Sequence, residues 1–435
     1  MSRHALWVYA ASSRAGTLGY DSLDHAFSFE YDPAWVGAAE AYPLSPHFPL
    51  RGPVPSSATV RRFLENLLPE GRALDVVATT HRISKSNIFG LVRELGAETA
   101  GALSFLPEGV EPAARASLRR EVGLDELAHR IEERAEVPFS VWDGRVRMSV
   151  AGYQDKIAVY CEQGRLYLVE GALSSTHLLK PEPADPRLPF LVANEHFCMR
   201  LAARVGLPVA RVDILRVPQP VLRIERFDRQ PADGGVRRLH IIDACQALDL
   251  PVTYKYERNF GSGRDVRDIR DGVSFERLFG TARYTVRRAL TTQTLVRWAL
   301  FQYLIGNSDA HGKNVSFFCP AAGLELAPFY DLVSVVQYPN LDHELAMAVG
   351  DSFELEHILP YDWAVFAHNC GIDRAYLARE MIRLAKIAGR EAPLQSASDD
   401  YVGDERGLVE DVRTLVDTQA DKLADTAKAL RGVEL

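Results

Sequence analysis

An apolar stretch that runs straight into a polar loop constrains the fold of this chain more than any other feature. Residues 295–305 are apolar apart from one arginine and one glutamine, so the helix predicted there is buried on almost every side. The helix leads into the loop Asn307-Ser-Asp309-Ala-His311-Gly-Lys313-Asn314, and a short strand is predicted over 315–318. A polar loop fixed between a buried helix and a strand is a place where reactive side chains are held in position.

The spacing of this loop indicates a particular chemistry. Asp309 and Asn314 are separated by four residues, and Asp331 follows beyond an apolar run. In protein kinases, this pattern supplies a catalytic base and two Mg²⁺ ligands for transfer of the ATP γ-phosphoryl group to a hydroxyl. We therefore expect Asp309 to act as the base and Asn314 and Asp331 to bind Mg²⁺. A lone Asp-x-x-x-x-Asn is also compatible with a solvated turn, but the flanking helix and strand favour the catalytic interpretation.

Composition narrows the class of protein. The 435 residues predict two to three domains, and the net charge of −8 argues against a surface that binds nucleic acid all over. The five cysteines have no metal-ligand spacing and are typical of reduced thiols in a cytoplasmic protein. The apolar residues 5–11 are too short to span a membrane and predict a first strand. We expect a cytoplasmic protein with no membrane attachment.

The order of the predicted elements indicates an α+β, two-lobed, protein-kinase-like fold. We expect an N-terminal α/β subdomain over 1–107 and a connecting segment over 108–139. A β-rich small lobe that carries a phosphate loop is predicted over 140–255. It contains several strands, a helix over 191–205 and two more strands, which is the order of a kinase small lobe. Residues 256–435 are predicted to form an all-helical large lobe with the catalytic loop.

Two candidates in the small lobe are a lysine and a glutamate. Lys180 ends a predicted strand just before Pro181, where a kinase lysine reaches the α- and β-phosphates. An exposed lysine on an edge strand is the alternative, and only the loop at 307–314 favours the catalytic interpretation. Glu195 lies on the following helix and is a candidate partner for Lys180. A glutamate on a helix surface is an equally open interpretation.

Two further segments are candidates for binding the nucleotide. The turn over 151–156 contains Gly152, which allows the backbone to approach a phosphate, and Lys156, which adds positive charge. A hairpin turn without a ligand is the alternative. The residues Glu225-Arg226-Phe227 close the last predicted strand, where their backbone is placed to hydrogen-bond adenine. A charged strand end explains the same residues.

These segments together resemble the HipA family of serine/threonine kinase toxins from type II toxin–antitoxin systems. The resemblance lies in residues 63–71, 101–105, 149–156, 176–181, 194–195, 225–229, 307–314 and 330–332. Each segment is short, but the set is specific and extends through most of the chain.

The resemblance implies roles for individual residues. Asp309 is similar to the catalytic aspartate of the family, Asn314 and Asp331 to its Mg²⁺ ligands, and Lys180 to its ATP lysine. Ser149 falls where the family autophosphorylates, an event that ejects the phosphate loop and switches the kinase off. The remaining ATP contacts implied are Ala151, Gly152, Tyr153, Gln154, Asp155, Lys156, Glu225, Arg226, Phe227, His311, Gly312, Lys313 and Tyr330. A lone histidine such as His311 is more often a structural hydrogen-bonding group.

The resemblance also implies a biological context. Relatives phosphorylate a serine of glutamyl-tRNA synthetase and cause growth arrest and drug tolerance (persistence). Their partner is HipB, a helix-turn-helix antitoxin that binds operator DNA and represses transcription jointly with the toxin. Two features depart from the pattern. Tyr153 is bulkier than the alanine expected in the phosphate loop, and the C-terminal helices match least clearly. The basic residues there either meet DNA or form a solvated helix face, which is favoured; they are Arg374, Arg379, Arg383 and Lys386.

Two other functions are compatible with the residues. A small-molecule phosphotransferase similar to the aminoglycoside phosphotransferases shares the Asp-x-x-x-x-Asn spacing, but residues 1–107 disfavour it. A kinase-shaped co-repressor that has lost catalysis is the second alternative. It is disfavoured by the intact set of Lys180, Asp309, Asn314 and Asp331.

Overall fold

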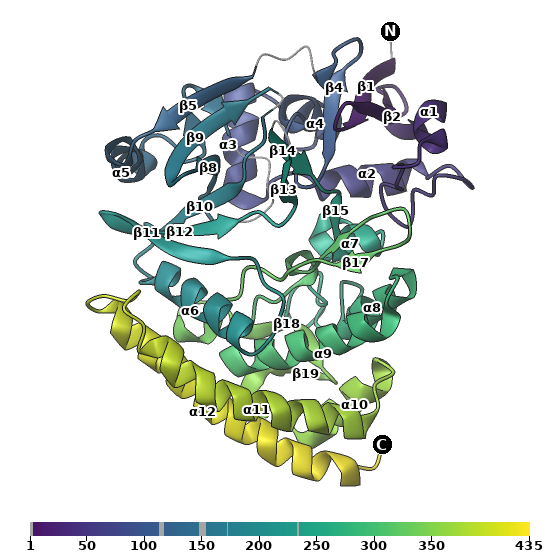
Figure 1. Cartoon of the computed structure of the whole chain (residues 1–435). Coiled ribbons are helices and arrows are strands. Elements are labelled where there is room, and N and C mark those ends of the chain that lie inside the picture. Colours follow the sequence, from purple (N-terminus) through teal and green to yellow (C-terminus); the bar gives the residue numbers. More distant parts are fainter. Residues whose placement is uncertain (1–2, 113–116, 148–153, 172, 233–234) are drawn as a thin grey trace. The chain divides into compact units, whose positions relative to one another are not determined.

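The structure, a computed structural model, describes residues 3–112, 117–147, 154–171, 173–232 and 235–435. The chain divides into two units, each built from three separate segments and both drawn in Figure 1. The first unit comprises residues 1–181, 215–252 and 317–324, and the second comprises 182–214, 253–316 and 325–435. Among the described residues, no helix has both the length and the apolar character needed to cross a membrane.

A four-stranded antiparallel sheet begins the first unit (Figure 1). Its strands, in the order β3-β2-β1-β4, are β1 (Arg3–Ala10), β2 (Ser13–Asp21), β3 (Ala26–Tyr31) and β4 (Leu103–Pro107). Four helices follow β3 in the chain, namely α1 (Pro33–Gly37), α2 (Ser57–Glu65), α3 (Gly71–His81) and α4 (Ile88–Leu95). Helix α2 begins where the Ser56 hydroxyl accepts the Thr59 N–H at 3.1 Å, an N-cap that satisfies an otherwise unpaired amide. Its Phe63 packs on Phe48 in the core.

A six-stranded sheet in the order β11-β12-β10-β8-β9-β5 forms the rest of the first unit's framework. Its strands are β5 (Leu118–Val122), β8 (Ile157–Glu162), β9 (Arg165–Glu170), β10 (His177–Pro181), β11 (Val212–Val217) and β12 (Gln219–Glu225). Helix α5 (Leu124–Glu132) contributes Leu127 and Ile131 to one apolar cluster with Ile157 and Leu179 of the sheet. Strand β8 begins with alternating buried and half-buried positions, whereas β9 and β10 contain consecutive buried residues.

Short elements complete the first unit. A small hairpin pairs β6 (Val141–Trp142) with β7 (Arg145–Val146), and another pairs β13 (Arg229–Ala232) with β14 (Gly235–Arg238). The others are β15 (Ile241–Asp243), α7 (Ala244–Ala247) and β16 (Ser316–Phe318), of which β16 begins at the end of a second-unit segment.

The second unit is mainly helical. Its helices are α6 (Leu191–Arg204), α8 (Phe275–Gly280), α9 (Arg288–Ile305), α10 (Pro360–Asn369), α11 (Arg374–Ser396) and α12 (Glu405–Ala429). The stretch 295–305 of α9 is buried nearly all round, as its composition predicts. Helices α11 and α12 lie side by side (Figure 1). Buried residues recur at helical spacing along α12, such as Val409, Val412 and Val416.

The prediction of an all-helical large lobe is wrong in one respect. Strands β18 (Glu344–Val349) and β19 (Ser352–Glu354) pair antiparallel within the second unit, and β17 (Glu325–Leu326) precedes them. The hairpin turns at Gly350, which adopts a left-handed φ of 63° between β18, whose last four residues are buried, and β19, in which Phe353 is buried. Helix α6 belongs to the second unit, whereas the predicted boundary placed it with the sheet.

Candidate active site

The end of helix α9 positions the predicted catalytic loop. Gly306 caps the helix in the left-handed conformation (φ 61°), and its N–H donates to the carbonyls of Gln302 and Tyr303. A Cβ on Gly306 would lie 2.5 Å from Cγ2 of Val336, so only glycine fits both the backbone and the space. The chain then turns sharply, and the Asn307 N–H also donates to Gln302, at 3.0 Å.

Hydrogen bonds within the loop fix its backbone. The buried Asn307 side chain donates to the Gln302 side chain at 2.9 Å and accepts the Asp309 N–H at 3.1 Å. The His311 N–H donates to the Asp309 carbonyl, and the Asn314 N–H donates to the His311 carbonyl, both at 2.9 Å. The loop is therefore rigid at the main chain, while the Asp309 carboxylate faces outward and is exposed.

Tyr256 contacts the predicted base directly. Its hydroxyl donates to Oδ1 of Asp309 at 2.6 Å, and its ring meets the His311 ring edge-on at 5.1 Å. The neighbouring Lys255 carbonyl accepts the Gly312 N–H at 2.9 Å. No motif or periodicity marks this tyrosine, because it lies 53 residues before Asp309 in a segment without a long helix or strand.

Asp331 lies beside the loop in a strained conformation. Its φ of 60° is left-handed, which is uncommon for a residue with a side chain and concentrates at functional sites. The preceding Tyr330 donates its hydroxyl to the Lys313 carbonyl at 2.5 Å and is within 2.8 Å of the Ser316 hydroxyl. The bond between Tyr330 and Lys313 therefore connects the residue directly before Asp331 to the residue directly before Asn314. Asn314 itself is buried on a short 3-10 turn.

His311 is a buried, uncharged group in the same loop. Burial lowers the pKa of His311 to about 3, with Lys255 adding to the effect and Asp331 opposing it. Among the described residues, its Nδ1 atom has no hydrogen-bond partner. A buried polar atom without a partner is costly and uncommon, so the position is suited to a ligand contact.

The first unit holds the other predicted site residues. Lys180 lies in β10, opposite Leu222 of β12, and is buried, as is Lys156 just before β8. Gln154 is half-buried and Asp155 is exposed. Ser149, Ala151, Gly152 and Tyr153 lie outside the described residues. Glu195 is buried on α6 of the second unit, and its pairing with Lys180 remains a prediction.

Arg226 is committed to a buried network. Its side chain donates to both carboxylate oxygens of Asp228, at 3.0 and 2.8 Å, and to the Ser175 hydroxyl at 2.9 Å. Its N–H donates to the Thr176 carbonyl, and its own carbonyl accepts the Arg229 N–H. The Arg226 side chain is therefore engaged within the protein, and adenine recognition by the main chain of 225–227 remains a prediction.

The basic residues of α11 are partly used within the second unit. Arg374 donates to the Val433 carbonyl at 2.6 Å, and Arg383 donates to the Glu380 side chain at 2.9 Å. Arg379 and Lys386 are exposed. Two of the four cations therefore have structural partners, in line with the solvated helix face that the sequence favoured.

Seven candidates from two segments of the second unit come together, since a hydrogen bond links the segment of Asp309, His311, Gly312, Lys313 and Asn314 to that of Tyr330 and Asp331. Comparison with known proteins adds an independent line of argument. Residues 148–391 match the family model of the HipA-like C-terminal domain, and residues 6–106 match that of the HipA N-terminal domain.

A similar protein sequence and a similar solved structure come from Shewanella oneidensis. The chain is 42% identical over 374 residues to its serine/threonine-protein kinase toxin HipA, which covers 85% of this chain and 84% of the relative. The solved complex of HipA with HipB and operator DNA contains a chain of TM-score 0.90 and 38% identity, covering 99% of this chain and 100% of that one. These matches confirm the predicted family, fold class and enzyme class. The chain belongs to the HipA family and is a serine/threonine-protein kinase with the two-lobed kinase-like fold.

Proposed function

We propose that this chain is a toxin that transfers the γ-phosphoryl group of ATP to a serine of a protein. The observation that carries the proposal is the loop 307–314, which the hydrogen bond from the Tyr330 hydroxyl to the Lys313 carbonyl links to the segment of Asp331. This loop lies in a chain that is 42% identical to a HipA kinase toxin over most of its length. Phosphoryl transfer depends on positioning and charge neutralisation more than on covalent chemistry, and a rigid loop with an exposed carboxylate suits that task.

Asp309, Asn314 and Asp331 have separate roles in this proposal. Asp309 orients the acceptor hydroxyl and takes its proton, while Asn314 and Asp331 bind Mg²⁺. Oxygen donors are the ligands that Mg²⁺ prefers, and a few protein ligands beside phosphate oxygens suffice for it. When bound, the metal neutralises charge on the β- and γ-phosphates. Among the described residues, no group of three or more His, Cys, Asp or Glu side chains forms a metal site, so phosphate and water oxygens supply the other ligands.

The other residues bind the nucleotide. Lys180, buried in β10, reaches the α- and β-phosphates, and residues 151–156 with Lys156 form the phosphate loop. The main chain of 225–227 binds adenine. His311, Gly312, Lys313 and Tyr330 complete the nucleotide contacts, and the buried Nδ1 of His311 supports this assignment. A neutral imidazole there accepts or donates one hydrogen bond without adding charge.

The proposal extends to target, partner and regulation. The toxin acts in the cytoplasm on glutamyl-tRNA synthetase, and the resulting lack of charged tRNA causes growth arrest and persistence. A HipB-like helix-turn-helix antitoxin neutralises it, and the two proteins together bind operator DNA. The solved relative in complex with HipB and operator DNA supports this partnership. Autophosphorylation of Ser149 then switches the kinase off.

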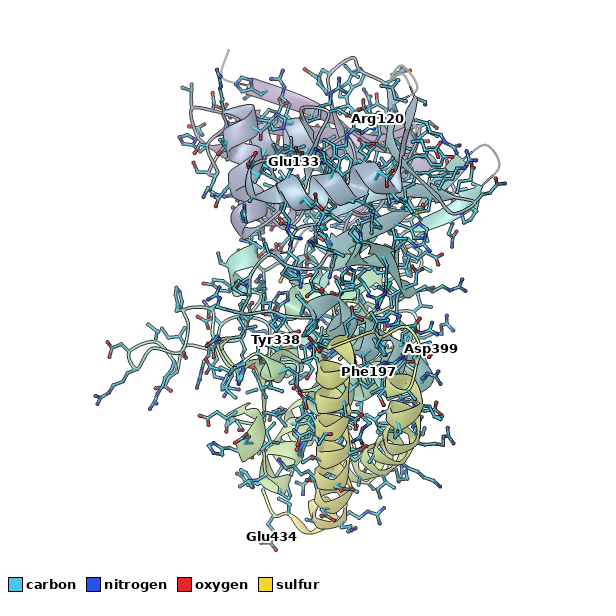
Figure 2. All side chains as sticks on the ribbon, turned by 90° about the vertical axis from the view of Figure 1, so that its left-hand side faces the viewer. Arg120, Glu133, Phe197, Tyr338, Asp399 and Glu434 are labelled. Carbon is cyan, nitrogen blue, oxygen red and sulfur yellow. The ribbon has the colours of Figure 1, made fainter. Side chains whose placement is uncertain are left out.

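The experiment uses the full chain with Mg²⁺ and γ-labelled ATP, first in a cell extract and then with purified glutamyl-tRNA synthetase. We expect label on a protein, loss of this label in Asp309→Asn, and loss of self-labelling in Ser149→Ala. The matched control is Asp399→Asn. Asp399 is an exposed carboxylate in the loop between α11 and α12, labelled in Figure 2.

The outcomes separate the competing functions. Label on a small molecule identifies a small-molecule phosphotransferase, and absence of Mg-ATP turnover together with DNA co-repression identifies a silent co-repressor. Growth arrest that persists undiminished in Asp309→Asn rules out the kinase mechanism of toxicity. Label on a protein other than glutamyl-tRNA synthetase supports the kinase activity and shows that the target is a different protein.

A further inference from the structure

The tyrosine that contacts Asp309 belongs to a segment held rigidly against the catalytic loop. On one side of Tyr256, the Lys255 carbonyl accepts the Gly312 N–H at 2.9 Å. On the other side, the Glu257 N–H donates to the Ala346 carbonyl of β18 at 2.9 Å. The same strand contacts the loop, because the Ala346 N–H donates to the Ser308 carbonyl at 2.8 Å. The backbone of Tyr256 is therefore fixed relative to the backbone of Asp309.

Burial at Glu257 strengthens this attachment. Its side chain is 2% exposed, accepts the Ala348 N–H at 2.8 Å and pairs with Arg270 at 2.5 Å. Gly272 packs against the Tyr256 carbonyl so closely that a Cβ would lie 1.7 Å from it. A segment anchored at a buried ion pair and by such close backbone packing does not shift independently of the catalytic loop.

The Tyr256 ring is also oriented. Its edge-on contact with His311 has an interplanar angle of 84°, and Lys255 Nζ lies 5.2 Å from the centre of its ring. From this fixed ring the hydroxyl reaches Oδ1 of Asp309 at 2.6 Å. The Asp309 carboxylate is exposed at the end of a side chain that rotates about two bonds, so the rigid backbone alone does not define its orientation.

We propose that Tyr256 is a positioning residue for phosphoryl transfer, whose hydroxyl holds the Asp309 carboxylate in the orientation that receives the acceptor serine. A carboxylate accepts about four hydrogen bonds, so the bond from the phenol leaves capacity for the acceptor hydroxyl. Tyr256 acts through Asp309 and makes no contact with the phosphates in this role. The inference rests on the proposed role of Asp309 as the base.

The test compares Tyr256→Phe with Tyr254→Phe in the full chain. Tyr256→Phe removes only the hydroxyl and keeps the ring against His311. Tyr254→Phe makes the same chemical change two residues away, where the ring contacts Phe260. Initial rates of label transfer from Mg·ATP to protein in extract give kcat and the KM for ATP. We expect Tyr256→Phe to lower kcat about tenfold with an unchanged KM for ATP, because a small loss of orientation costs one to two orders of magnitude in rate. Tyr254→Phe keeps both parameters.

A double-mutant cycle separates positioning from a general structural role. In an Asp309→Asn background, Tyr256→Phe is expected to have no further effect on the residual rate, since the oriented carboxylate is already absent. An equal loss in both backgrounds, a change in KM alone or an increase in kcat for Tyr256→Phe overturns the inference; an increase identifies the hydroxyl as a competitor of the acceptor serine. If Asp309→Asn itself keeps full activity, the proposed function fails. If Tyr256→Phe has wild-type kinetics while Asp309→Asn is inactive, the inference about Tyr256 fails and the proposed function stands.

Discussion

A Cβ atom on Gly312 would lie 2.6 Å from Cγ2 of Val273, so the catalytic loop packs on this valine with no room for a side chain. The Gly312 N–H is fixed at 2.9 Å from the Lys255 carbonyl, so the loop cannot move away without breaking that bond. Overpacking of this kind typically costs about 1–3 kcal/mol and shifts the backbone.

We therefore expect Gly312→Ala to lower phosphoryl transfer by about tenfold or more, because the loop displaces both Asp309 and Asn314. The double variant Gly312→Ala/Val273→Ala is expected to recover part of the rate. The rate of label transfer from γ-labelled ATP to protein is measured for the single and the double variant. Gly389→Ala is the control, since Gly389 lies on the exposed face of α11 and a Cβ there meets nothing within 4 Å. Equal rates for Gly312→Ala and wild type would contradict the packing argument.

Asp228 lies between two buried arginines of the first unit. Besides its two bonds with Arg226, it accepts from Arg229 Nη1 at 2.6 Å and from the Gly101 N–H at 2.8 Å. Burial acts to raise the pKa of Asp228, but Arg226 and Arg229 overcome this and leave it far below its usual range. Burial and Arg226 together lower the pKa of Arg229 to about 9, so it remains charged at neutral pH.

Asp228→Asn would remove the closest anionic partner of these two buried arginines and leave them only Glu98, which lies 3.8 Å from Arg226 and 4.0 Å from Arg229. Breaking such a pair typically destabilises a protein by about 3–5 kcal/mol. We expect a clear fall in the denaturation midpoint, measured by denaturant titration followed by circular dichroism. Asp425→Asn removes the partner of an exposed lysine, Lys428, and is expected to leave the midpoint unchanged. A midpoint for Asp228→Asn equal to that of the control would show that the network contributes nothing to stability.

His240 predicts a pH dependence of stability. Its ring is buried, its Nε2 lies 2.8 Å from the Leu44 carbonyl, and it stacks on Tyr42 at 5.1 Å. Burial lowers the pKa of His240 from 6.5 to about 4. Between these values the unfolded chain binds a proton that the folded chain does not, so stability falls as the pH drops below about 6.5.

Because the unfolded chain binds a proton at this single group, the free energy of unfolding is expected to be about 2 kcal/mol lower at pH 5 than at pH 7. His240→Gln keeps an amide near the Leu44 carbonyl and does not titrate, so its denaturation midpoint should change less between pH 7 and pH 5. His129→Gln, at an exposed position of α5, serves as the control and should retain the wild-type difference. A pH difference in His240→Gln as large as that of the wild type would show that the acid sensitivity arises elsewhere.

Local patterns predicted the loop 307–314 and the buried helix before it, whereas long-range contacts did not appear in the sequence. Asp309 and Asn314 occur within one run after a helix whose apolar composition signals its burial. The hydroxyl of Tyr256 reaches Asp309 only because β18 and Gly272 place an irregular segment against that loop. No periodicity or motif marks such a contact.

The buried side-chain partners of Arg226 were likewise not evident from the sequence. The Arg226 side chain pairs with Asp228, two residues along the chain, and with the Ser175 hydroxyl, while the adenine contact expected of the main chain stays a prediction. A charged side chain with nearby acids pairs with them when it is buried, and burial at a strand end is not evident from local alternation. The β18–β19 hairpin was missed because its strands are short and lie between helices.

Asp331→Asn provides a test of the metal site with little backbone disturbance. Asparagine tolerates the left-handed conformation about as well as aspartate does, so the φ of 60° is kept, whereas alanine at this position would add strain. The substitution removes one negative charge while conserving size. Because a carboxylate binds Mg²⁺ far better than an amide oxygen does, we expect a rise of about tenfold or more in the Mg²⁺ concentration needed for binding of a fluorescent ATP analogue.

Asp309→Asn is the matched control for this measurement, since the proposed base is not a metal ligand and its loss should leave the magnesium titration unchanged. The fall in phosphoryl transfer then has different origins in the two variants. Raising the Mg²⁺ concentration is expected to restore part of the phosphoryl-transfer rate of Asp331→Asn, whereas no Mg²⁺ concentration restores the rate of Asp309→Asn. Identical magnesium titrations for Asp331→Asn and wild type would remove Asp331 from the metal site and leave its strained backbone without an explanation.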